Sequence, residues 1–285
     1  MTERDSLLAG VRRVLVVHAH PDDEVLAGGA LLRELHDRGV RVALVTCSRG
    51  EAGEIVAGVL PEGTSEVELA AVRECEVRGS VEALGIAAHY WLGTPPARVS
   101  RAGAGAGASA GASADTGASA DTRAGADADT RAGADARARV YRDSGMRWVR
   151  PGVAGPADSS DARSLTAAPL AEVVADLAAV VEVERPELIV SYDDAGGYGH
   201  PDHLRAREAA LAVARASGVR FAELIDDPEL PGTEWFSLEH QRDAVLAALR
   251  SHRTQLTVDA DRRQLTHSGG QRQDVETDIG LRIVA

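Results

Sequence analysis

The amino-acid sequence predicts an α/β fold, in which a Rossmann-like, mainly parallel sheet carries helices on both faces. Short apolar runs rich in β-branched residues alternate with longer segments in which apolar residues recur at helical spacing. Glycine follows several of these helical segments, as is common where a helix ends. The chain has 285 residues, and we expect them to form a single domain.

The predicted elements follow one another in a regular order along the chain. Strands are expected at residues 14–18, 41–47, 87–92, 188–192 and 219–224. Helices are expected at residues 26–37, 66–84, 169–184, 202–217 and 239–250. In sheets of this class, ligands bind at the carboxyl ends of the strands, so the chemistry should lie in the loops that follow them.

Residues 100–138 differ from the rest of the chain, because they comprise only Ala, Gly, Ser, Asp, Thr and Arg. No side chain larger than alanine offers apolar surface there, so burial cannot compensate for the conformational entropy lost on ordering. We expect a disordered surface insertion within the domain.

Charge and composition narrow the class of partner. The formal net charge of -13 argues against nucleic acid or an anionic membrane and favours a small-molecule substrate. Two cysteines do not make a disulfide framework. We find no signal peptide and no apolar stretch long enough to span a bilayer, so we expect a cytoplasmic protein. The sequence does not indicate an oligomeric state.

The first motif that carries chemistry is His18-Ala-His-Pro-Asp-Asp-Glu24, directly after the first predicted strand. Its three acids repel one another unless a positive charge holds them, and a divalent metal is the usual solution. His20 and Asp23 are spaced to reach one ion, and both are standard zinc ligands. The alternative is an acidic helix N-terminus favoured by the helix dipole, but this alternative gives no reason for His20.

The second motif is Gly196-Gly-Tyr-Gly-His-Pro-Asp-His203, a few residues after the fourth predicted strand. Glycine-rich turns before helices are common, so this motif alone is weak evidence. Together, the two motifs predict a catalytic metal site with three protein ligands and one position open to substrate. Zinc at such a site activates water, and iron(II) is an alternative metal. Of the adjacent carboxylates Asp22 and Asp23, one can bind the metal while the other accepts a proton.

These residues resemble the PIG-L/LmbE-like N-acetylglucosamine deacetylases, whose signatures match Ala19–Glu24 and His200–His203. The resemblance runs from about residue 14 to about residue 216, outside the low-complexity insertion. It implies a zinc site of His20, Asp23 and His203. It also implies roles for four further residues: Asp22 as general base, His200 as oxyanion stabiliser or proton donor, Asp202 as the residue orienting His200, and Tyr198 as the group polarising the acetyl carbonyl.

A narrower resemblance, to the mycothiol-pathway deacetylases of actinobacteria, rests on four further segments of the chain: Thr46–Glu54, Arg73 with Glu76, Tyr141–Met146 and Gly196–His203. It implies that Arg73 and Asp143 bind substrate hydroxyls, and that the substrate is an N-acetylglucosaminyl-inositol. The alternatives are a mycothiol S-conjugate amidase and a deacetylase of another GlcNAc-bearing metabolite. The chain after Leu224 resembles the family weakly, and we assign His252 and Gln255 no role.

Other classes of protein fit the sequence less well. A nucleotide-binding Rossmann protein would need Gly-x-Gly-x-x-Gly after the first strand, where His-Pro-Asp-Asp stands instead. No Gly-x-Ser-x-Gly elbow of a serine hydrolase is present. A metal-binding protein without catalytic activity remains an alternative. In such a protein, a substitution of Asp22 would leave metal binding intact and there would be no activity to lose.

Overall fold

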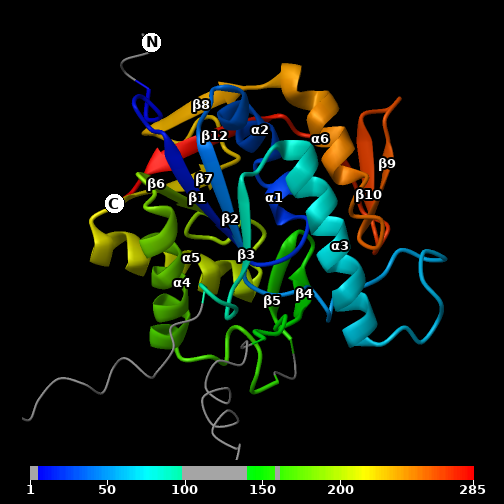
Figure 1. Cartoon of the computed structure of the whole chain (residues 1–285). Helices are drawn as coiled ribbons and strands as arrows, with labels where there is room; N and C mark the ends of the chain where they lie inside the picture. The colour runs from blue at the N-terminus through cyan, green and yellow to red at the C-terminus, as the bar shows by residue number, and fades with distance from the viewer. Residues whose placement is uncertain (1–5, 98–139, 158–160) are drawn as a thin grey trace, which may run out of the picture.

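The computed structural model describes residues 6–97, 140–157 and 161–285 (Figure 1). Its centre is a seven-stranded sheet with the strand order β3-β2-β1-β6-β7-β12-β8. Five neighbouring strands run parallel: β3 (Ala88–Trp91), β2 (Arg41–Thr46), β1 (Arg13–His18), β6 (Leu188–Ser191) and β7 (Arg220–Ile225). At one edge, β12 (Asp278–Ile283) pairs antiparallel with both β7 and β8 (Thr233–Ser237). The predicted mainly parallel sheet is confirmed, whereas the predicted insertion at 100–138 lies outside the described residues.

Both faces of the sheet are buried, because successive side chains of a strand point to opposite faces. Val14 and Val16 of β1 belong to one apolar cluster, and Leu15 and Val17 belong to another. The first cluster is covered by α2 (Gly29–Asp37), α6 (Arg242–Leu249) and the end of α3 (Glu66–Leu84), and the second by α4 (Leu170–Glu184) and α5 (Pro201–Ser217). Figure 1 shows these two helical layers on either side of the strands.

The helix boundaries agree with the sequence prediction except at two places. The helix expected at 26–37 is divided into α1 (Asp23–Leu26) and α2, with a break at Ala27 and Gly28. The helix expected at 239–250 begins as a 3-10 turn, η3 (Glu239–Gln241), before α6. α3 has the expected bounds, because a Ser65–Glu68 capping box begins it and Gly85 ends it.

Several short strands were not predicted. β4 (Met146–Arg150) and β5 (Val153–Pro156) form a hairpin, and β9 (Leu256–Asp259), β10 (Gln264–His267) and β11 (Arg272–Asp274) form a small antiparallel sheet. These strands are three to five residues long, and all except β5 contain at least two polar or charged residues. Within the described ranges, no helix is long and apolar enough to cross a membrane.

The strand order places a crevice between β1 and β6. From β1 the chain continues to β2 and β3 on one side, and it later returns to β6 and β7 on the other side. At such a switch point the loops leaving the two central strands diverge, which opens a ligand site at their carboxyl ends. The two motifs singled out in the sequence follow β1 and β6, so both meet in this crevice.

Candidate metal and catalytic site

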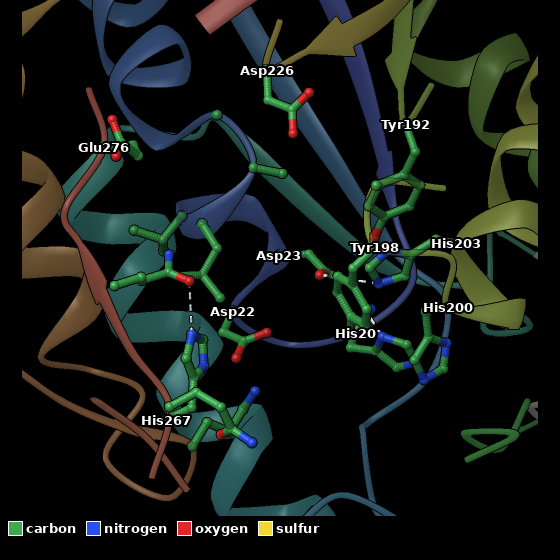
Figure 2. A pocket seen from close by; sticks show the side chains of 18 of the residues that line it. His20, Asp22, Asp23, Tyr192, Tyr198, His200, His203, Asp226, His267 and Glu276 are labelled. Carbon is green, nitrogen blue, oxygen red and sulfur yellow. Dashed lines mark hydrogen bonds and ion pairs between the residues drawn. The ribbon is translucent and has the colours of Figure 1, made fainter. Parts of the chain in front are cut away.

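Imidazole and carboxylate groups from the two loops converge at the crevice. Figure 2 shows His20, Asp23, His200 and His203 close together, with Tyr192 and Tyr198 beside them and Asp22 facing the open space. The four ligand-type side chains are all buried. Two sets of donor atoms lie within 4.8 Å of one another: His20, His200 and His203 form one set, and His20, Asp143 and Asp202 form the other.

Asp23 lies between two of these histidines. Its Oδ2 accepts hydrogen bonds from the backbone N–H of His20 at 2.8 Å and from the hydroxyl of Tyr192 at 2.6 Å. Its Oδ1 lies 3.3 Å from His203 Nε2, and Oδ2 lies 3.5 Å from His20 Nδ1. Burial opposes ionisation, but the neighbouring imidazoles of His203 and His20 hold the pKa of Asp23 well below its usual range. Oδ1 is therefore an ionised oxygen open to a further partner.

His203 has one ring nitrogen committed and one free. Nδ1 donates to the carbonyl oxygen of Gly196 at 3.2 Å, which places the proton of a neutral ring on Nδ1. Nε2 is buried and has no hydrogen-bond partner among the described residues. Its lone pair faces the Oδ1 lone pairs of Asp23, an arrangement that a cation between them would satisfy.

His20 is surrounded by carboxylates. Its Nε2 lies 3.2 Å from Asp202 Oδ2 and 3.6 Å from Asp143 Oδ1. Burial lowers the pKa of His20, but the negative charge of Asp143 and hydrogen bonds to the acids outweigh burial and raise the pKa well above its usual value. The acids Asp23, Asp143 and Asp202 lie close to the imidazoles of this site, and such a group of side chains suits a divalent cation with nitrogen and oxygen ligands.

Asp22 begins α1 with a backbone φ of 90°, a conformation that residues other than glycine rarely adopt. Burial and the adjacent charge of Asp23 raise the pKa of Asp22 to about 7. Its side chain lines the central cavity. Asp22 and Asp23 therefore point to different surroundings, and only Asp23 contacts the histidines.

His200 is oriented in a way that the sequence did not predict. The backbone N–H of Asp202 donates to His200 Nδ1 at 3.1 Å, so a neutral His200 carries its proton on Nε2. The Asp202 carboxylate contacts Ser144 and His20, so Asp202 reaches His200 through its backbone N–H and not through its carboxylate. Burial and the neighbouring His20 and His203 lower the pKa of His200 to about 3, so the ring is a neutral hydrogen-bond donor.

Tyr198 is 42% exposed and lines the cavity. Its ring packs edge-on against His203, with centroids 5.0 Å apart, and packs at a tilt against Trp148 of β4, with centroids 5.8 Å apart. Its carbonyl oxygen accepts a hydrogen bond from Ala154 of β5. The β4–β5 hairpin thereby supports the loop that carries Tyr198.

Arg73 and Asp143 both line the cavity, but each is also engaged within the protein. The Arg73 guanidinium donates to the carbonyl oxygens of Gly50 and Glu54 and to Thr254. Asp143 accepts from the backbone of Gly145 and faces His20. Asp143 thus lies beside the group of possible metal ligands, whereas Arg73 holds the loop after β2.

Sequence reasoning missed three side chains that support the site. Tyr192 directly follows β6, and a tyrosine next to an apolar strand gave no distinctive signal. His252 contacts Glu24, and Gln255 contacts Pro21, across more than 200 residues of chain. Such long-range contacts leave no local pattern, although the His-x-x-Gln spacing was visible in the sequence.

The site opens into a cavity of about 1330 Å³. One wall carries the two motifs, and the opposite wall comes from the C-terminal part of the chain, including His267 and Glu276 (Figure 2). Trp235 also lines the cavity. Pockets for small ligands commonly have volumes of about 300–1,000 Å³, so this cavity has room for more than one sugar ring.

Known proteins resemble this chain in sequence and in fold. The PIG-L family, described as GlcNAc-PI de-N-acetylase, matches residues 15–214. A Kineococcus radiotolerans protein named 1D-myo-inositol 2-acetamido-2-deoxy-alpha-D-glucopyranoside deacetylase is 33% identical over 88% of this chain and 70% of its own length. An Actinosynnema mirum protein of the same name is 32% identical over 86% of this chain and 81% of its own length.

Among solved structures, the N,N'-diacetylchitobiose deacetylase of Pyrococcus horikoshii shares the fold, with a TM-score of 0.55 and 21% identity over 88% of this chain and 74% of that chain. Because the family match covers most of the chain and includes both motifs, this chain belongs to the PIG-L family of N-acetylglucosamine de-N-acetylases.

Proposed function

We propose that this protein hydrolyses the acetamide of an N-acetylglucosaminyl-inositol, with a zinc ion held by His20, Asp23 and His203. The observation that carries the proposal is the free Nε2 of His203 facing Asp23 Oδ1 in a buried site, with Asp22 beside them on the cavity. The substrate is that named for the relatives from Kineococcus radiotolerans and Actinosynnema mirum. Iron(II) is chemically compatible with the same donors.

A zinc ion supplies Lewis acidity, which makes water a nucleophile near neutral pH and polarises a carbonyl oxygen. Asp22 accepts a proton from the attacking water as its oxygen bonds to the acetyl carbon. Its pKa of about 7 suits a group that must take up and then release a proton. When the C–N bond breaks, the protonated Asp22 can return this proton to the leaving amine, giving acetate and the free amino sugar.

His200 and Tyr198 are proposed to act on the acetyl oxygen. The backbone hydrogen bond at His200 Nδ1 leaves its Nε2–H to donate to the developing oxyanion. Tyr198 lines the same cavity, and its hydroxyl is a second hydrogen-bond donor beside the Nε2–H of His200. Two such donors stabilise negative charge that develops only in the transition state, which raises kcat.

The test is acetate release from purified zinc-loaded protein. GlcNAc-inositol is compared with a mycothiol S-conjugate, with N,N'-diacetylchitobiose and with free N-acetylglucosamine. We expect the highest kcat/KM for GlcNAc-inositol. Turnover of the S-conjugate without turnover of GlcNAc-inositol would replace this proposal with the amidase alternative. A cytoplasmic location stays a prediction from the sequence.

A further inference from the structure

We propose that Glu24, His252 and Gln255 form a clamp that positions the Asp22 carboxylate for catalysis. These three side chains act through Asp22 and are positioning residues. The inference rests on the proposed function, because it takes Asp22 as the base. Two members of the clamp, His252 and Gln255, come from the C-terminal part of the chain, beyond the residues matched by the family at 15–214.

The clamp binds both the N–H and the carbonyl oxygen of one peptide group. The N–H of Asp22 donates to Glu24 Oε2 at 3.0 Å, and the carbonyl oxygen of Pro21 accepts from Gln255 Nε2 at 2.6 Å. These two atoms belong to the same planar Pro21–Asp22 peptide unit. The two bonds therefore fix the orientation of that plane, and with it the unfavourable φ of 90° at Asp22.

Glu24 is itself held rigidly. Its Oε1 accepts from His252 Nε2 at 2.7 Å and from the Ser80 hydroxyl. Glu24, His252 and Ser80 have no exposed surface. A buried carboxylate is kept in place by such partners, because removing one would leave an unpaired polar group away from water. His252 and α3 therefore anchor the carboxylate that holds the N–H of Asp22.

The Asp22 side chain has no comparable support of its own. Among the described residues, no hydrogen bond or ion pair holds its carboxylate, although it lines the cavity. Its position therefore follows from its backbone conformation. Because a base must lie within hydrogen-bond reach of the proton it removes, the clamp controls the efficiency of proton transfer.

The first experiment replaces Gln255 with methionine, which removes the donor to Pro21 and keeps the length of the side chain. We expect Gln255→Met to lower kcat about tenfold or more, since small misplacements of a catalytic group are costly. KM and the zinc Kd, measured by competition with a chelator, should change less than about twofold. The control is Gln241→Met, since the Gln241 amide also donates hydrogen bonds but binds Glu34 and Asp37 away from Asp22. It should leave kcat unchanged.

A double-mutant cycle separates positioning from a general structural effect. If Gln255 acts through Asp22, then Gln255→Met should cause no further loss of kcat in an Asp22→Asn background. Independent, multiplicative losses would overturn the inference, as would wild-type kcat in Gln255→Met or a large loss of zinc affinity. Full activity of Asp22→Asn would instead refute the proposed base, so the two failures are distinguishable.

The His252 arm is tested by rescue. His252→Gln keeps a donor for Glu24, whereas His252→Ala leaves the buried carboxylate without it. We expect His252→Gln to retain at least about tenfold more kcat than His252→Ala, with equal zinc stoichiometry. If His252→Ala does not fold, the kcat of His252→Gln is compared with that of the wild type instead. If His252→Gln also lowers kcat in the Asp22→Asn background, the result counts against the clamp.

Discussion

The ring of Tyr192 lies flat against the ring of His203, with centroids 4.1 Å apart and planes 6° apart. The Tyr192 hydroxyl donates to Asp23 Oδ2 and accepts from the backbone N–H of Ala19. One side chain directly after β6 therefore orients a carboxylate at the start of α1 and an imidazole near the start of α5. Groups that orient metal ligands in this way contribute strongly to metal affinity.

Replacing Tyr192 with phenylalanine should weaken zinc binding. The variant keeps the ring against His203 but loses the hydroxyl that holds Asp23 Oδ2. We expect the zinc Kd to rise about 10- to 100-fold, the range seen when such supporting groups are removed. Competition with a fluorescent chelator measures this change. Tyr90→Phe is the control, because the Tyr90 hydroxyl bonds to Glu184 away from the site, and its zinc Kd should not change.

Substitution of Asp22 should separate chemistry from metal binding. We expect Asp22→Asn to retain zinc but to lose a factor of about 10²–10⁴ in kcat, the usual contribution of a general base. His20→Ala and His203→Ala should instead lose zinc, as measured by metal analysis of the dialysed proteins. Loss of zinc from Asp22→Asn together with retention in His203→Ala would reverse the proposed roles.

Zinc should stabilise the folded protein, because the buried acids around His20 and His203 repel one another without a cation. At a free zinc concentration 100 times the Kd, linkage predicts about 2.7 kcal/mol of added stability. Thermal unfolding of chelator-treated protein, with and without zinc, measures the shift in Tm. The shift should be absent in His203→Ala, and an equal shift there would place the stabilising zinc elsewhere.

Trp235 should matter for large substrates only. It lines the cavity. An aromatic face packed against a second ring is worth about 0.5–1.5 kcal/mol, so Trp235→Ala should raise KM for GlcNAc-inositol about 2- to 10-fold. KM for free N-acetylglucosamine should not change. Trp91→Ala is the control, because Trp91 packs against Arg49 and does not line the cavity. Equal effects on both substrates would contradict this assignment.

Glu184 should contribute to stability against acid. Hydrogen bonds from Arg41 lower the pKa of Glu184. Burial opposes this effect, and a hydrogen bond from Tyr90 adds to it. A lowered pKa stabilises the fold above the unfolded value, which is about 4.3, and this contribution disappears as the pH falls through the folded value. We expect the free energy of urea unfolding to differ less between pH 7 and pH 3.5 in Glu184→Gln than in wild type. An unchanged difference would mean that Glu184 plays no part.

The sequence predicted the parallel strands well, because strands buried on both faces are continuous apolar runs such as Val14–Val17. It failed for β4, β5 and β8 to β12. Most of these segments are too short to show a clear alternation, and β12 pairs with β7 and β8, which lie far from it along the chain. The break between α1 and α2 was also missed. Apolar spacing continues across Ala27 and Gly28, although the backbone does not.

The sequence identified the candidate site residues because their side chains are chemically unusual at strand ends. It could not identify how they contact one another. Whether the carboxylate or the backbone N–H of Asp202 reaches His200 depends on a geometry that spacing does not encode. The same holds for Tyr192, His252 and Gln255, whose partners lie 169 to 234 residues away along the chain.

The antiparallel strand β12 has a consequence for synthesis on the ribosome. It inserts between β7 and β8, so the sheet edge cannot close until residues 278–283 have emerged from the exit tunnel. The proposed ligands His20 and Asp23 and the proposed base Asp22 leave the tunnel early, and His203 follows much later. The nascent chain therefore carries these acids and histidines before the C-terminal wall of the cavity covers them.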